Sequence, residues 1–181
     1  WQEINSKLIS DLADSYMLPS SRGKLKVLIF SRPNIGLVRD NSLIIKIAND
    51  KDIDLIFKNK PRGVKDNPGT YDSCPSALLI QWADVVIGSV SSIVLDIFYY
   101  KKQFIFLSYL SNDNVGNLEN SDICMVALDE TMAMRYLSKI KQKPYNSSNI
   151  KIKEYYDNKV YEKSLGFDVL GDYYKLYTNL N

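Results

Sequence analysis

The composition of this 181-residue chain is typical of one globular domain with a full hydrophobic core, with 45% hydrophobic and 24% charged residues. The net charge is only +2 and the lysines are dispersed, which argues against a nucleic-acid partner. The sequence contains no histidine, which removes the Ser-His-Asp route to catalysis and leaves little basis for a zinc site.

The apolar runs and the cysteines indicate a protein of the cytoplasm. Runs such as residues 93–100 are interrupted by charge well before the roughly 18 residues that a membrane span needs. Cys74 and Cys124 have no C-x-x-C spacing and are expected to be free thiols. The chain begins at Trp1 without a signal-peptide pattern, which is consistent with a piece of a longer protein. We expect a cytoplasmic location, with at most peripheral association with the inner face of the membrane.

In chain order, the first half of the sequence predicts a leading helix and linker followed by a β-loop-α-β unit. Residues 1–17 have helical apolar spacing, and residues 18–23 form the linker. The β-rich run 26–30 predicts a strand buried on both faces. The loop 31–36, a helix over 41–49 and a second strand over 54–58 follow it.

The second half continues the alternation of strands and helices. We expect helices over 75–82, from the serine turn to Tyr100 and over 131–140, and strands over 84–87, 103–107 and 123–128. Long polar loops are predicted over 65–73 and 108–121. The alternation predicts an α/β fold, a doubly wound, Rossmann-like parallel sheet with helices on both faces. We assign residues 24–143 to this nucleotide-binding domain, residues 1–23 to the leading segment, and residues 144–181 to a helical tail packed on the same domain.

The most informative local feature is a hydroxyl-rich turn between the third strand and its helix. Ser91 and Ser92 lie where free backbone N–H groups and the helix dipole favour an anion. Because this turn follows the carboxyl end of a parallel strand, it lies where open α/β sheets bind ligands. Ser89 and Ser91 are also ordinary helix-capping residues, and a purely structural role stays open.

The order of four motifs resembles the carboxyl-terminal, donor-binding half of a B-type glycosyltransferase fold, in particular bacterial CDP-glycerol glycerophosphotransferases and surface-polysaccharide transferases. The motifs span about residues 24–140. They are Ser31-Arg32-Pro33, Lys58-Asn59-Lys60-Pro61-Arg62, the segment from Ala83-Asp84 through Ser91-Ser92 to Asp96, and Phe104-Ile105-Phe106-Leu107-Ser108-Tyr109. Lys60 stands where the family has histidine, so a fixed cation replaces a titratable donor.

The resemblance implies which residues hold a nucleotide diphosphate donor, linked to CDP or UDP. They are Ser91, Ser92, Arg62, Lys60 and Arg32 at the diphosphate, and Asp96 at a ribose or sugar hydroxyl. Solvated arginines and a structural hydrogen bond of Asp96 are the competing interpretations. The loop residues Asn112, Asp113 and Asn114 are weaker candidates for contact with the base or transferred group. We identify no catalytic residue, require no metal and expect no cofactor.

The predicted function is donor binding in a bacterial transferase that moves a sugar or polyol-phosphate unit to a cell-surface polysaccharide or a teichoic-acid-like acceptor. An amino-terminal domain that presents the acceptor would be missing from this segment, which by itself is expected to be inactive. Two alternatives stay open: a non-catalytic module that binds a nucleotide or a protein, and a relative of sugar-nucleotide 2-epimerases. A flavodoxin-like carrier is less attractive, because no aromatic pair flanks the serine turn.

Overall fold

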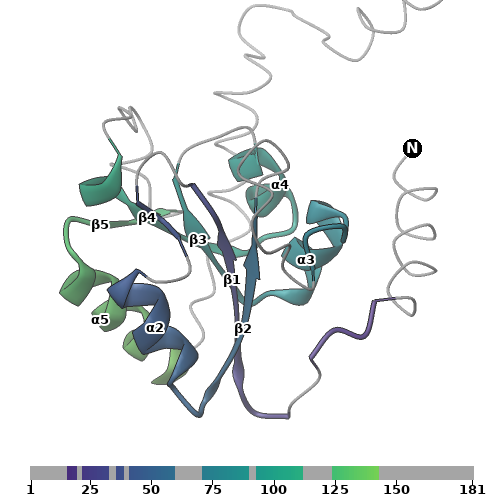
Figure 1. Ribbon diagram of the computed structural model, residues 1–181, viewed down its shortest axis with the longest axis horizontal. Helices are drawn as coiled ribbons and strands as arrows, with labels where there is room; N and C mark the ends of the chain where they lie inside the picture. Colours follow the sequence, from purple (N-terminus) through teal and green to yellow (C-terminus); the bar gives the residue numbers. More distant parts are fainter. Residues whose placement is uncertain are drawn as a thin grey trace, which may run out of the picture. The chain divides into compact units, whose positions relative to one another are not determined.

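A computed structural model describes residues 16–19, 22–32, 36–38, 41–59, 71–89, 93–111 and 124–142. The described strands and helices alternate along the chain, as the sequence predicts (Figure 1). The strands are β1 (Leu25–Phe30), β2 (Ile53–Lys58), β3 (Val85–Gly88), β4 (Gln103–Leu107) and β5 (Cys124–Ala127). The helices are α2 (Ser42–Ala48), α3 (Ser76–Trp82), α4 (Ile93–Tyr99), the 3-10 turn η2 (Ser108–Leu110) and α5 (Glu130–Gln142).

The five strands form one sheet in the order β2-β1-β3-β4-β5, and every pairing between them is parallel. The predicted fold class, a doubly wound parallel sheet, is therefore confirmed. The chain first adds β2 on one side of β1 and then crosses to add β3 on the other side. Crossovers between parallel strands usually contain a helix, and α2, α3 and α4 lie in the first three of them.

Both faces of the sheet are covered, which explains why the strands are apolar on both sides. Helices α2 and α5 cover one face, and α3 and α4 cover the other (Figure 1). On the first face, alternate residues of the central strands, such as Ile29, Ile87 and Ile105, are fully buried in one cluster with Leu43 and Leu137. Their sequence neighbours, including Leu28 and Phe104, are equally buried toward the opposite layer.

Local capping fixes where the helices on the first face begin. The side chain of Asn41 accepts a hydrogen bond from the backbone N–H of Leu43 at 3.0 Å, which caps α2. The carboxylate of Asp129 accepts one from the backbone N–H of Met132 at 2.6 Å, at the start of α5. Pro75 precedes α3 as its cap residue, one position before the first turn where the sequence had suggested it.

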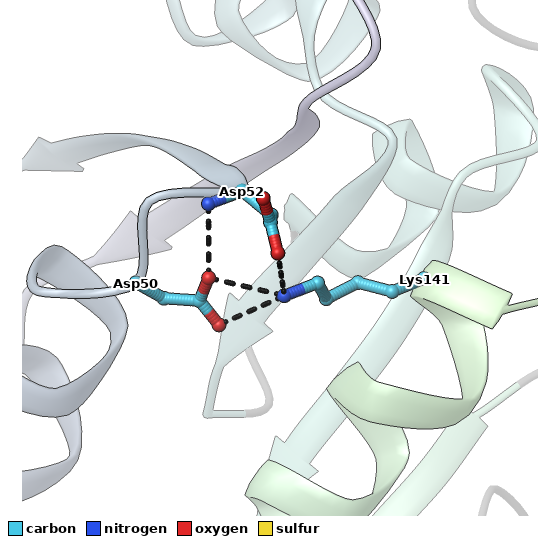
Figure 2. Close-up of polar contacts among 3 residues, drawn as sticks. All are labelled: Asp50, Asp52 and Lys141. Carbon is cyan, nitrogen blue, oxygen red and sulfur yellow. Dashed lines mark hydrogen bonds and ion pairs between the residues drawn. The ribbon is translucent and has the colours of Figure 1, made fainter.

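A lysine at the end of α5 is tied to the turn between α2 and β2, at the amino edge of the sheet. The Nζ of Lys141 lies 3.0 Å from both carboxylate oxygens of Asp50 and 3.1 Å from a carboxylate oxygen of Asp52 (Figure 2). The backbone N–H of Asp52 also donates to Asp50 at 3.0 Å. Both the backbone hydrogen bond and Lys141 lower the pKa of Asp50, in that order of size.

This network predicts an acid-sensitive part of the stability. Because the folded pKa of Asp50 lies below its unfolded value, the stabilisation is complete above about pH 4 and is lost as the pH falls through the folded pKa. We expect Asp50→Asn to lower the free energy of unfolding at pH 7 by up to about 1 kcal/mol. Urea unfolding at pH 7, 5 and 3 checks this, and a difference from wild type that stays constant across that range would argue against it.

Several sequence predictions lie outside the described residues. They are most of the leading helix over 1–17, the loop over 112–121 and the tail 144–181, so the domain division remains a prediction. In the described part, no helix is long and apolar enough to cross a membrane.

Candidate functional site

The candidate site lies at the carboxyl ends of β1, β2 and β3, which are immediate neighbours in the sheet. The last residue of β1, Phe30, is in register with the last residue of β2, Lys58. On the other side, Ile29 of β1 is in register with Ile87 of β3. Since the strands are parallel, the three loops that follow them begin at the same edge, about 5 Å apart.

This edge also contains the topological switch point of the sheet. The loop after β1 leads to α2 on one face, whereas the loop after β3 leads to α4 on the opposite face (Figure 1). The two loops therefore diverge from adjacent strand ends, and such a divergence leaves the crevice in which open α/β sheets bind ligands. The sequence predicted a ligand site at a strand end, and the strand order β2-β1-β3 shows which strand ends are adjacent.

The loop after β1 is a short, fixed turn that carries Arg32. Arg32 and Leu37 exchange two backbone hydrogen bonds, at 3.0 and 3.2 Å, and Gly36 between them has a φ of +75° that favours glycine. The side chain of Leu37 is fully buried and anchors the turn in the core. Asn41 closes it by donating from Nδ2 to the carbonyl of Gly36 at 3.1 Å. Arg32 is half-buried at the base of this turn.

The turn after β3 is described only at its two ends. Ser89 is 7% exposed at the end of the strand, and α4 begins at Ile93. Ser91 and Ser92, the predicted phosphate ligands, lie outside the described residues, so their role stays a prediction. The structure places the start of α4 after the carboxyl end of β3, as the sequence predicts, and shows in addition that β3 is next to β1.

Asp96 lies in the first turn of α4 with an exposed side chain. The interpretation that competed with sugar binding was a structural hydrogen bond of this carboxylate, since an unpaired carboxylate is costly to bury. Because it faces solvent instead, none is required, and no described residue donates a hydrogen bond to its carboxylate. Partial loss of hydration nevertheless raises the pKa of Asp96. Its role at a ribose or sugar hydroxyl stays a prediction.

The end of β2 holds a group of polar residues that the sequence did not single out. Lys58 is only 5% exposed, and its Nζ donates to three backbone carbonyls of residues 71–74. The carboxylate of Asp72 accepts two hydrogen bonds from Asn59, one from the backbone N–H and one from Nδ2, both at 2.8 Å. Lys60 and Arg62, the predicted diphosphate ligands, follow directly but lie outside the described residues.

Little in the amino-acid sequence indicates these contacts. Lys58 was a polar residue at the end of a strand, and its acceptors are backbone carbonyls, which no side-chain pattern reveals. Asp72 fell in a polar stretch predicted to be an exposed loop, whereas its carboxylate is bound to Asn59. The one available signal was the lysine itself, because a lysine that continues an apolar strand needs a polar environment for its ammonium group.

Tyr109 and Cys74 near this edge, and Cys124 at the opposite, amino end of β5, are not ionised nucleophiles at neutral pH. Burial, followed by the charges of Glu130 and Asp129, raises the pKa of Tyr109 to about 12. Burial also raises the pKa of the Cys124 thiol to about 12 and that of Cys74 above its usual value. These three groups therefore stay protonated at neutral pH. Within the described ranges, no cluster of three or more carboxylate, thiol or imidazole side chains suits a metal ion.

A separate cleft of about 600 Å³ lies at the opposite, amino edge of the sheet. It is lined by the starts of β1 and β4 and by charged residues of both signs, among them Lys24, Asp84, Lys102 and Lys141. Several of these charges are already engaged with each other or with backbone groups. This cleft is at the wrong end of the strands for the predicted donor site.

Comparison with known proteins confirms the predicted resemblance at the level of the fold. No family model and no curated protein sequence matches the chain. Solved structures of the wall teichoic acid polymerase TagF do match. The structure soaked with CDPG for 30 minutes has a TM-score of 0.53 at 15% identity, covering 84% of this chain and 41% of that chain.

Two further TagF structures give the same result. The TagF structure whose name gives no substitution matches with a TM-score of 0.52 at 15% identity. This match covers 84% of this chain and 42% of the TagF chain. A histidine-to-asparagine variant of TagF matches with a TM-score of 0.54 at 14% identity. The match covers 84% of this chain and 43% of the TagF chain. This chain therefore shares the fold of a part of TagF and spans about two fifths of the length of the TagF chains.

Proposed function

We propose that this chain is the donor-nucleotide-binding half of a transferase that moves a sugar or polyol-phosphate unit from a nucleotide diphosphate to a cell-surface polymer of the teichoic acid type. The observation that carries this proposal is the adjacency of the strand ends of β1, β2 and β3 at the switch point. The loops that start there contain every cationic and hydroxyl residue that the sequence predicts at the diphosphate.

The chemistry of these loops suits a diphosphate. Arg32 offers planar donors at the end of β1, and the predicted ligands Lys60 and Arg62 follow β2. Ser91 and Ser92 immediately precede α4, so they would add hydroxyl and backbone donors. In the transferase reaction the bond to the diphosphate breaks, and fixed cations would stabilise the negative charge that develops on the leaving group. The similarity to TagF, one structure of which was soaked with CDPG, supports a cytidine-linked donor.

In this proposal a separate amino-terminal domain, and not the described residues, presents the acceptor polymer. The chain spans only 41–43% of the matched TagF chains, and the described part contains no clear acid–base pair at the site. The same proportion favours the alternative of a non-catalytic nucleotide-binding module. Transfer of glycerol phosphate or sugar to an acceptor, assayed with the chain alone and with any adjoining domain of its protein, separates these two functions.

Calorimetric titration with CDP, UDP, GDP and ADP tests donor binding. We expect binding of CDP or UDP, and a roughly tenfold or greater loss of affinity in Arg32→Ala, in Arg62→Ala and in the double variant Ser91→Ala/Ser92→Ala. Lys51→Ala removes one positive charge from an exposed turn at the opposite edge of the sheet and serves as the matched control. A folded wild-type chain that binds none of the four nucleotides would contradict the proposal, as would equal losses in Lys51→Ala and Arg32→Ala.

A further inference from the structure

The polar group at the end of β2 connects three loops of the candidate site. The backbone carbonyl of Lys58 accepts a hydrogen bond from the N–H of Ser31 at 2.8 Å, which ties it to the loop that carries Arg32. Its side chain reaches the segment that precedes α3, and the next residue, Asn59, is bound by Asp72. One strand end thus contacts both the start of the loop after β1 and the segment 71–74 before α3.

The ammonium group of Lys58 is fully used in this arrangement. Its Nζ lies 3.4 Å from the carbonyl oxygen of Tyr71, 2.8 Å from that of Asp72 and 2.5 Å from that of Cys74. A lysine has three donors, so every one has an acceptor. Burial lowers the pKa of Lys58, and the charge interactions with Cys74 and Asp72 oppose this effect by raising it. An apolar residue would fill a strand end at lower cost, so the buried cation implies a need to hold these carbonyls.

Asp72 closes the base of the stretch from the other side. Its two carboxylate oxygens accept separate hydrogen bonds from the backbone N–H and the Nδ2 of Asn59, each at 2.8 Å. Such paired, charge-assisted bonds fix orientation as well as position. Residues 59 and 72, which are 13 positions apart, are therefore held side by side.

We propose that Lys58, Asn59 and Asp72 form a clamp that joins the end of β2 to residues 71–74, on either side of the stretch 60–70, and that Lys58 and Asp72 are positioning residues for the donor site. The second part rests on the proposed function, since it assumes that Lys60 and Arg62 bind the diphosphate. In the clamp, Lys58 and Asp72 touch no ligand themselves; they hold Asn59, the residue before the predicted ligands Lys60 and Arg62, at the end of β2.

Limited digestion with trypsin of the full chain, without nucleotide, tests the clamp directly. We expect cleavage after Arg62 and Lys65 to become about tenfold faster in Lys58→Met, because the ends of the stretch are released. Lys102→Met is the matched control. The Nζ of Lys102 also donates to a backbone carbonyl, that of Gln81 at 2.7 Å, and burial lowers its pKa too, but it lies at the amino edge. Equal acceleration of these cleavages in both variants would overturn the clamp.

Asp72→Asn provides a second, milder variant and separates positioning from simple charge. The substitution removes a negative charge near the diphosphate site, so electrostatics alone would tighten the binding of CDP or UDP. The clamp predicts the opposite, a several-fold weaker affinity together with faster cleavage after Arg62, since the new amide cannot accept both bonds from Asn59. Tighter nucleotide binding by Asp72→Asn would contradict a positioning role.

The two proposals fail in different ways. A wild-type chain that binds no nucleoside diphosphate contradicts the proposed function, and with it the donor-site role of Lys58 and Asp72. The protease comparison between Lys58→Met and Lys102→Met decides on the clamp whether or not any nucleotide binds. If Lys58→Met does not fold, the same comparison is made between Asp72→Asn and the wild type.

Discussion

Replacing Phe98 by alanine is expected to lower the free energy of unfolding by about 3–5 kcal/mol, because Phe98 is among the largest fully buried side chains of the described core. Phe98 belongs to α4, and its side chain is fully buried. Its ring packs edge-to-face on that of Phe104 in β4, with 6.5 Å between the ring centroids and 79° between the planes. Alanine would remove both the buried apolar surface and this aromatic contact, and would leave a cavity between helix and sheet.

Such a loss is a large fraction of the free energy of unfolding of a typical domain, which is roughly 5–15 kcal/mol. Urea unfolding followed by circular dichroism measures it. Tyr99→Ala is the matched control, because Tyr99 is the next residue of the same helix but is 50% exposed, and we expect it to cost about 1 kcal/mol or less. Similar costs for the two substitutions would mean that α4 does not pack on β4 through Phe98.

The position of α4 also links this prediction to the proposed site. In the sequence the serine turn immediately precedes α4, so the position of this helix sets where the turn ends. A helix displaced by the loss of Phe98 would displace the end of this turn even in molecules that remain folded. We therefore expect Phe98→Ala, where it folds, to bind CDP or UDP more weakly than Tyr99→Ala does.

Much of the fold was predictable because a doubly covered parallel sheet leaves a clear mark on the sequence. The run Gln103–Leu107 was predicted with its observed limits, since five consecutive buried residues bounded by lysines and a serine fit a central strand. The order of strands in the sheet was not predictable in the same way. It depends on which faces α2 and α3 cover, and that follows from packing between residues far apart in sequence.

The candidate site was predictable only where side-chain type carries the signal. Arginine after β1 and serines before α4 are visible in the sequence, but only the structure shows that the strands before them, β1 and β3, are adjacent. The contacts of Lys58 were missed because their acceptors are backbone carbonyls 13 to 16 residues away. The exposure of Asp96 was missed because an apolar helix pattern does not show which side of the helix the sheet covers.

Leu37 carries the second large prediction, because it joins the loop of Arg32 to the core. It lies outside any regular strand or helix, yet its side chain is fully buried in the cluster that α2 and α5 cover. Leu37→Ala is expected to lower the free energy of unfolding by about 2–5 kcal/mol, since a buried loop leucine leaves a cavity as a helical one does. Val38→Ala, at the half-buried neighbouring position, should cost clearly less.

The same substitution tests whether the turn after β1 positions Arg32. The backbone bonds between Arg32 and Leu37 do not depend on the leucine side chain, but the turn is held against the sheet by that side chain. If Arg32 binds the donor diphosphate, Leu37→Ala should weaken CDP or UDP binding at temperatures where the variant is still folded, whereas Val38→Ala should not. Calorimetry at 10 °C, with circular dichroism to verify folding, measures both. Unchanged nucleotide affinity in a folded Leu37→Ala variant would show that the core contact stabilises the domain without orienting the arginine.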